Sequence, residues 1–433
     1  MTDSSTPMSM QQYVEKHFLW NFSVNAMDIS FVTLAMNMIS QSTILPLLVN
    51  DLTDSKIAVG FIPAVLSIGF LLPQLFTAGH AESLRRKKPF IVLWSAIGER
   101  LPYLVAAFAI LLFARSTPLL TLGLIYLSLL VASGTAGALN PAWYDMIAKV
   151  IPANRRGLWM GVGSGGGAFM GIAGAALAGW FLTHFDFPMK YALCFFTAAL
   201  FQFLSWACLS LTREPESETV KEHNGLREYF KKLPAVLKRD PNYLVFLISR
   251  SVMNLGLMST GFYIVYGSER YNLSGAEVGG LTALLVGVQA VLNLALGVIG
   301  DRYGHKIVLT AGALAMALAA LIALVWRAPA ALWVIFILLG AALAADSVAG
   351  FSIIIEFGSP EDRPTYIGLT NTLLAPARSL SPILGGWLAA SLGYSWLFAA
   401  ALVASAGSAL MMGWWLKDPR HTQMEWGVIP HLR

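Results

Sequence analysis

The sequence GVIGDRYGHK, residues 297–306, is a short charged segment between two long apolar runs at roughly 276–299 and 307–326. Its ionisable side chains are Asp301, Arg302, His305 and Lys306. Its glycines permit a tight turn and a close approach of neighbouring helices. The pattern therefore predicts a charged turn that joins two apolar helices.

The composition of the whole chain indicates a membrane-embedded helical protein. Of the 433 residues, 56% are hydrophobic and 12% are charged, and the mean hydropathy is +0.64. A soluble protein carries about twice that share of charge. We expect no cleaved signal peptide, because the N-terminus lacks a basic start followed by a short apolar core. Cys194 and Cys208 lie in one apolar run, which argues against disulfides and thiol chemistry.

Apolar runs long enough to cross a bilayer recur along the chain, since a membrane-spanning helix needs about 20 such residues. We therefore predict an all-α membrane protein with twelve transmembrane helices. The predicted spans are 18–49, 57–79, 89–113, 118–147, 157–183, 189–212, 242–267, 276–299, 307–326, 329–356, 364–391 and 394–416.

The longest link between these spans, residues 213–241, is charged and falls in the middle of the chain. It separates a predicted N-terminal six-helix bundle, residues 1–212, from a C-terminal six-helix bundle with a short tail, residues 242–433. We interpret residues 213–241 as a cytoplasmic linker.

The two halves also resemble each other in sequence. LTDSKIAVGF at 52–61 resembles NLSGAEVGGL at 272–281, at an offset of about 219 residues. The same offset carries Glu82 onto Asp301. Duplicated helical halves are typical of secondary transporters.

The distribution of Lys and Arg predicts the orientation, because cytoplasmic loops carry an excess of both residues. With both termini placed inside, 21 fall on the cytoplasmic side and 5 on the outer side. The remaining three, Arg100, Arg250 and Arg378, lie within spans. This asymmetry accounts for the net charge of +5, and no nucleic-acid partner is expected.

The opening segment carries a family resemblance. It fits the loop Gly-x-x-x-Asp-Arg-x-Gly-x-Arg/Lys through Gly297, Asp301, Arg302, Gly304 and Lys306. With its twelve spans, two halves and long central link, the chain resembles the major facilitator superfamily of transporters over its whole length. The resemblance implies two pseudo-symmetric bundles with cytoplasmic termini, and a gating loop between spans 8 and 9.

The carboxylate of Asp301 is the part of this loop that would close the gate. The resemblance implies a contact with the positive N-terminus of span 11, which starts near Arg363. Glu82 stands at the matching position of the first half, but Ala78 replaces the first glycine there. We therefore expect the second-half latch to be the better formed one. A solvated turn is the alternative for both loops.

Charged side chains at span depth are functional candidates, because they cost several kcal/mol unless paired or wetted. The six clear cases are Asp28, Glu99, Asp346, Arg100, Arg250 and Arg378. The resemblance places Asp28, Asp346, Arg250 and Arg378 on spans that line or flank a central cavity. We expect these four to meet there and to bind protons or substrate. Static ion pairs are the alternative.

Glu99 and Arg100 are neighbours on span 3, which the resemblance makes a scaffold helix. Adjacent helical positions point about 100° apart, so the two are not expected to face one cavity equally. We interpret them as a structural ion pair. Among the neutral polar residues within spans, Asn25, Asn254 and Gln289 are candidates for solute contact. Hydrogen bonding between helices is the alternative for each.

These features favour a secondary active transporter, coupled to protons, that moves a small polar or anionic organic solute by alternating access. The alternative is a proton-driven exporter of amphipathic compounds, supported by the glycine-rich span 5 alone. A non-transporting membrane sensor is a remote alternative. We find no pattern of an enzyme, a cofactor site or a metal site. We expect a multi-pass monomer in the lipid bilayer, in the cytoplasmic membrane if the source is a prokaryote.

Overall fold

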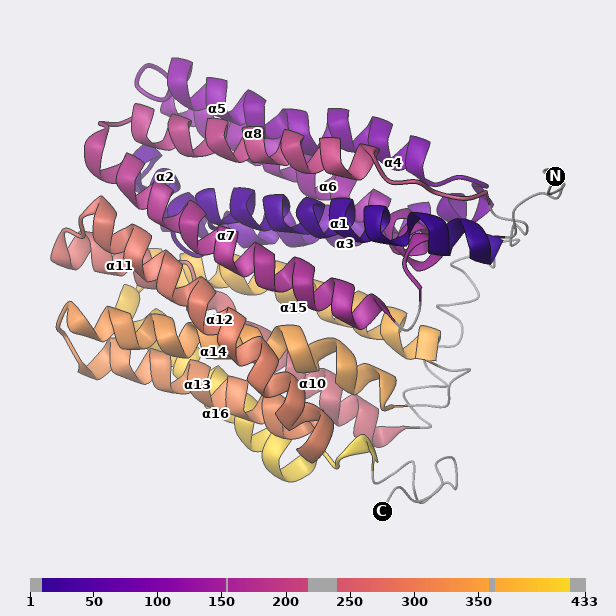
Figure 1. Ribbon diagram of the computed structural model, residues 1–433. Coiled ribbons are helices and arrows are strands. Elements are labelled where there is room, and N and C mark those ends of the chain that lie inside the picture. The colour runs from indigo at the N-terminus through magenta and orange to yellow at the C-terminus, as the bar shows by residue number, and fades with distance from the viewer. Residues whose placement is uncertain (1–9, 153–154, 217–239, 358–362, 421–433) are drawn as a thin grey trace, which may run out of the picture.

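The computed structural model describes residues 10–152, 155–216, 240–357 and 363–420, and the regular elements in these ranges are helices (Figure 1). The N-terminal half, residues 10–216, contains α1 Met10–Met38, α2 Ile44–Leu52, α3 Lys56–Ser83, α4 Lys88–Trp94, η1 Ser95–Arg100, α5 Leu101–Phe113, α6 Pro118–Val150, α7 Arg156–His184 and α8 Met189–Ser210. The all-α prediction is confirmed.

The C-terminal half, residues 240–420, repeats this pattern of long helices. It contains α10 Pro241–Gly256, η3 Leu257–Ser259, α11 Phe262–Tyr271, α12 Gly275–Tyr303, α13 His305–Val325, α14 Ala330–Ile355, α15 Arg363–Ser391, α16 Tyr394–Leu410 and η4 Met411–Trp415. In the described part of the chain, ten helical stretches are long and apolar enough to cross a membrane. The two predicted spans outside that set correspond to α1 with α2, and to α15.

The first and seventh predicted spans are not continuous helices, which corrects the sequence-based boundaries. Residues 39–43 separate α1 from α2, and η3 with a short turn separates α10 from α11. The first break carries polar residues and is followed by Pro46. A Cβ on Gly261, in the second break, would lie 3.2 Å from Cγ of Pro46, so the two breaks meet.

The third predicted span is a helix with a π-helical insert. Residues Ser95–Arg100 form η1 between α4 and α5. Pro102 follows at the start of α5, where it has no N–H to donate to the preceding turn. The π-helical turn directly precedes this proline and carries Glu99 and Arg100.

The bundle has two distinct ends. One end of the bundle, which we call the basic end, is on the right in Figure 1. It holds the start of α1, the end of α6 and the basic loops after α3 and α12. The short helices α2 and α11 lie at the opposite end, which we call the far end.

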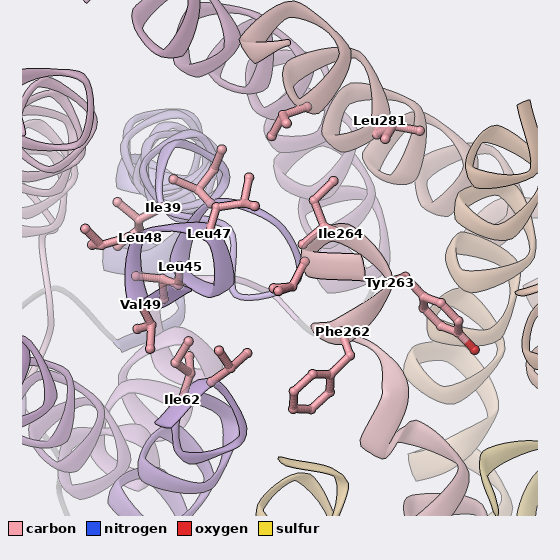
Figure 2. Packing of buried hydrophobic residues seen from close by; sticks show 14 of the residues in the cluster. Ile39, Leu45, Leu47, Leu48, Val49, Ile62, Phe262, Tyr263, Ile264 and Leu281 are labelled. Atoms are coloured by element: carbon pink, nitrogen blue, oxygen red, sulfur yellow. The ribbon is translucent and has the colours of Figure 1, made fainter. Parts of the chain in front are cut away.

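The buried cores show that the two halves pack together at the far end. One cluster there combines residues of both halves, including Leu45 of α2, Phe262 and Ile264 of α11, and Leu281 of α12 (Figure 2). Toward the basic end the clusters are separate. One belongs to the C-terminal half, around Tyr243 and Phe246, and the other belongs to the N-terminal half.

Glycine contacts between α7 and α12 also show that the two halves pack together at the far end. A Cβ on Gly179 of α7 would lie 2.7 Å from Cα of Gly279 on α12, so the backbones touch near the far end. A Cβ on Gly161 or Gly165 of α7, or on Gly297 of α12, would meet nothing within 4 Å. The structure is therefore closed at the far end and loosely packed along these helices at the basic end.

Candidate coupling and solute sites

The N-terminal half contains a buried cluster with two carboxylates and one guanidinium. Ser205 on α8 donates a hydrogen bond of 2.6 Å from Oγ to Oδ1 of Asp28 on α1. Nη2 of Arg100 donates to the same Ser205 Oγ at 3.2 Å, and Nη1 of Arg100 forms an ion pair with Glu99. Asp28 is therefore linked to Arg100 through a serine hydroxyl, whereas Glu99 contacts it directly.

A cavity of about 270 Å³ adjoins this cluster. Asp28, Glu99 and Arg100 all line it, together with polar groups of Thr33 and Asn140. The ion pair predicted for Glu99 and Arg100 is present. Both residues line this cavity, and a π-helical insert rather than a regular helix carries them.

The C-terminal half contains the opposite combination, with one carboxylate and two guanidiniums. Nη1 of Arg250 on α10 lies 2.5 Å from Oδ1 of Asp346 on α14, and the Arg250 side chain is 2% exposed. Arg378 on α15 is half-buried and interacts electrostatically with Asp346. Among the described residues, no carboxylate lies within ion-pair distance of Arg378.

The buried charges therefore pair within each half. Asp28 interacts with Arg100 and Ser205, and Asp346 interacts with Arg250 and Arg378. The cavity at Asp28 is lined by N-terminal residues, so the meeting of Asp28 with Asp346 and the two C-terminal arginines in one cavity stays a prediction. Sequence spacing carried no information on Ser205, which joins the cluster across 177 residues.

The neutral candidates differ in their surroundings. Asn25 is buried, and its Nδ2 donates to Asn21 O at 2.8 Å and to Thr212 Oγ1 at 3.1 Å. These contacts favour a structural hydrogen-bonding role for Asn25 over solute contact. Asn254 is buried one turn after Arg250 and donates to its carbonyl oxygen at 2.9 Å. Gln289 is half-buried on α12.

A family model described as Major Facilitator Superfamily matches residues 27–268 and 246–425. The chain belongs to the major facilitator superfamily. It is thus an integral, multi-pass membrane protein of a family that transports small molecules. No curated protein matches the sequence.

Solved structures with the same fold are distant in sequence. A bacterial homologue of the human lysosomal transporter Spinster, in an inward-facing and unoccupied conformation, is 13% identical with a TM-score of 0.61, over 96% of both chains. A D-xylose–proton symporter is 14% identical with a TM-score of 0.62, over 95% of this chain and 98% of the other. The human organic anion transporter MFSD10 is 15% identical with a TM-score of 0.60, over 91% and 99%.

The superfamily loop forms the predicted turn. Gly304 has φ +101°, which an L side chain rarely adopts, and it ends α12 immediately before α13 begins at His305. Lys306 donates from Nζ to Gly413 O at 3.0 Å and so ties the turn to η4. A Cβ on Gly304 would lie 2.4 Å from Oδ2 of Asp418, so the Asp418 side chain packs directly on the turn.

The side chain of Asp301 is 84% exposed, and His305 Nε2 lies 3.8 Å from its Oδ1. Arg302 beside it is also exposed. The predicted latch partner lies next to residues 358–362, which are outside the described residues, as are the side chains of Glu82 and Arg363. The gating contact of Asp301 therefore stays a prediction.

A different set of contacts holds this loop to its own half. Arg420, beyond η4, donates to the carbonyl oxygens of Gly300 at 2.9 Å and Asp301 at 2.8 Å. It also donates to Glu356 Oε1 at 2.7 Å, which lies 2.6 Å from Nδ1 of His305. No local sequence signal predicts this network, because Arg420 lies more than one hundred residues beyond the loop that it binds.

Two asparagines make matching contacts at the basic end. Asn21 on α1 accepts from the backbone N–H of Arg213 at 2.8 Å and donates to its carbonyl at 3.1 Å. Asn242 on α10 makes the same pair of contacts with Lys417, both at 2.9 Å. In each half the first long helix therefore holds the chain that leaves the last one.

Proposed function

We propose that this chain is a secondary active transporter that couples protons to the movement of a small organic anion by alternating access. The observation that carries the proposal is the unequal sorting of the buried charges. The N-terminal cluster contains Asp28 and Glu99 against Arg100, and the C-terminal cluster contains Asp346 against Arg250 and Arg378. The first has one negative charge in excess, and the second has one positive charge in excess.

An excess carboxylate in a buried site is stabilised when it binds a proton, because an unpaired charge at membrane depth is costly. Glu99 is already paired directly with Arg100, whereas Asp28 reaches that guanidinium through Ser205. We therefore assign the transported proton to Asp28. The adjoining cavity of about 270 Å³, which Asp28 lines, has room for water molecules.

An excess guanidinium attracts the opposite charge. Arg378 has a planar fork of donors that matches a carboxylate or phosphate, and no described carboxylate is paired with it. The Arg250–Asp346 pair keeps the neighbouring charge balanced. We assign Arg378 to the anionic group of the solute. Symport then follows, because one bound proton and one bound monoanion neutralise both clusters together.

The two halves are the moving bodies of this proposal, with the basic end in the cytoplasm. The joint core at the far end and the separate cores at the basic end correspond to an inward-open state. Closure of the basic end would require α7 and α12 to approach where Gly161 and Gly297 now meet nothing within 4 Å.

An exporter of amphipathic compounds remains the second candidate. The feature that supports it is the glycine-rich helix α7. The glycines of α7 pack against α1, where a Cβ on Gly167 would lie 2.8 Å from Oγ1 of Thr33 and one on Gly174 would lie 3.0 Å from Leu34 O. Helix packing thus accounts for these glycines without a drug site.

The test is a solute screen on purified protein in proteoliposomes with an imposed pH gradient. Carboxylates, phosphate esters, neutral sugars and amphipathic cations would be compared, with internal pH followed by a trapped dye. We expect an organic anion to accumulate with proton entry. Asp28→Asn should retain exchange without gradient-driven accumulation, and Arg378→Gln should lose binding of the anion.

Asp54→Asn, an exposed carboxylate next to the start of α3, is the matched control and should transport as the unmodified protein does. Accumulation of amphipathic cations outside, driven by protons, would favour the exporter. Gradient-driven accumulation that survives Asp28→Asn would remove the proposed proton site.

A further inference from the structure

A second cavity lies at the basic end of the N-terminal half. It is a groove of about 760 Å³ between α1, α4 and the end of α8. Its walls are apolar and aromatic, with Trp20, Val92, Leu93 and Trp206. Both indoles are fixed, since Trp20 Nε1 donates to Leu211 O at 2.9 Å and Trp206 Nε1 donates to Val92 O at 2.8 Å.

The rim of this groove is basic. Arg86, Lys88 and Arg213 line it. The Arg213 guanidinium lies 5.0 Å from the ring centroid of Trp20, and its Nη1 lies 3.0 Å from Nδ1 of His17. In the described part of the chain, no carboxylate forms an ion pair with Arg213 or Lys88.

The acidic residues nearby do not cancel this charge. Glu214 also lines the groove, but its carboxylate accepts from the backbone N–H groups of Lys87 at 3.0 Å and Lys88 at 2.7 Å. It also pairs with Lys149 at 3.3 Å. Arg86 pairs with Glu216 at 3.1 Å, and both of these side chains are more than half exposed. The rim therefore keeps an excess of positive charge.

We propose that this groove binds the headgroup of an anionic phospholipid from the leaflet at the basic end. Its volume lies within the range of about 300–1,000 Å³ that is typical of small-molecule pockets. Aromatic walls below a basic rim match the boundary between acyl chains and a phosphate. In the other half, Arg420 beyond the last span is instead engaged with backbone carbonyls and Glu356.

Native mass spectrometry of the full-length protein, with equal amounts of phosphatidylglycerol and phosphatidylcholine, tests the proposal. We expect phosphatidylglycerol to be retained in preference. Arg213→Gln and Lys88→Gln should each reduce its ratio to phosphatidylcholine by about fivefold, since each cation near an anionic surface contributes about that factor. Arg213→Lys, which keeps the charge, should retain most of the preference and guards against loss of folding.

Arg155→Gln is the matched control, because Arg155 is an exposed arginine at the same end and is not a lining residue of the groove. An unchanged lipid ratio in the Arg213→Gln, Lys88→Gln double variant would overturn the proposal. An equal loss in Arg155→Gln would do the same. Displacement of phosphatidylglycerol by millimolar inorganic phosphate, together with phosphate-dependent stabilisation that the double variant lacks, would assign the groove to free phosphate instead.

Discussion

Asp28 and Arg100 share a single hydroxyl, because Ser205 Oγ donates to Asp28 Oδ1 at 2.6 Å and accepts from Arg100 Nη2 at 3.2 Å. This serine is therefore the link through which the proposed proton site is held beside its counter-charge. Ser205 is fully buried, so water does not readily take the place of its hydroxyl. Removal of the hydroxyl therefore costs the hydrogen bonds that it makes to Asp28 and Arg100.

Ser205→Ala is expected to slow proton-driven accumulation roughly tenfold or more, since a hydrogen bond to a charged group contributes about 1.5–3 kcal/mol. Exchange of solute without a gradient should change little. Ser210→Ala is the control, because that hydroxyl donates to Ala207 O within its own helix. Equal behaviour of the two alanine variants in gradient-driven uptake would show that the bridge has no part in coupling.

For the Arg250–Asp346 ion pair, we expect the loss of one partner to lower stability more than the loss of both. Arg250 is 2% exposed, so removal of Asp346 leaves a buried positive charge, a loss of about 3–5 kcal/mol in comparable buried pairs. Asp346→Ala should lower the thermal unfolding midpoint in detergent by several degrees. The double variant Arg250→Met, Asp346→Leu should recover most of that loss, because it removes both charges together.

A double variant as unstable as Asp346→Ala would mean that the side-chain packing of Arg250, rather than its charge, stabilises this region. Asp54→Asn, at an exposed site, supplies the reference for a lost carboxylate.

The residues show why the sequence predicted the helices and the turn but not the site. Long apolar runs and the glycine at position 304 are local signals, and the turn formed where expected with φ +101°. The pairing of buried charges is not local. The Asp28–Ser205 contact joins residues 177 apart, and the direction of Glu99 depends on a π-helical insert that no regular periodicity contains. The breaks at residues 39–43 and in span 7 were missed because each is short and apolar residues resume directly after it.

An ion pair at the rim of the closed far end is expected to bias the closure, and exchange of its two charges tests this. Lys56 of α3 forms an ion pair with Glu269 of α11, which also accepts from Tyr394 Oη at 2.9 Å. Exposed pairs of this kind contribute about 0.2–1 kcal/mol, so Glu269→Lys should shift the open population by roughly 1.5- to 5-fold. The swap Lys56→Glu, Glu269→Lys should restore it.

The labelling rate of a cysteine at position 282 by a maleimide measures this shift, in a background without Cys194 and Cys208. Thr282 is fully buried and its Oγ1 lies 2.8 Å from Oγ1 of Thr43 across the two halves, so it is reached when the far end opens. If Glu269→Lys labels at the rate of its parent, the pair does not bias the closure.

The contact of Gly179 with Gly279 makes the strongest prediction about the transport cycle. A Cβ on Gly279 would lie 2.6 Å from Cα of Gly179 and 3.0 Å from Ala175 O, and backbone atoms do not move aside as a flexible side chain does. Gly279→Val should therefore prevent closure of the far end, abolish transport and increase labelling at position 282 while the protein remains folded.

Gly123→Val is the matched control, since a Cβ on Gly123 meets nothing within 4 Å, and it should transport normally. Normal transport by Gly279→Val would mean that α7 and α12 need not touch during the cycle. Loss of transport without increased labelling would mean that the valine acts by distorting the fold rather than by holding the far end open.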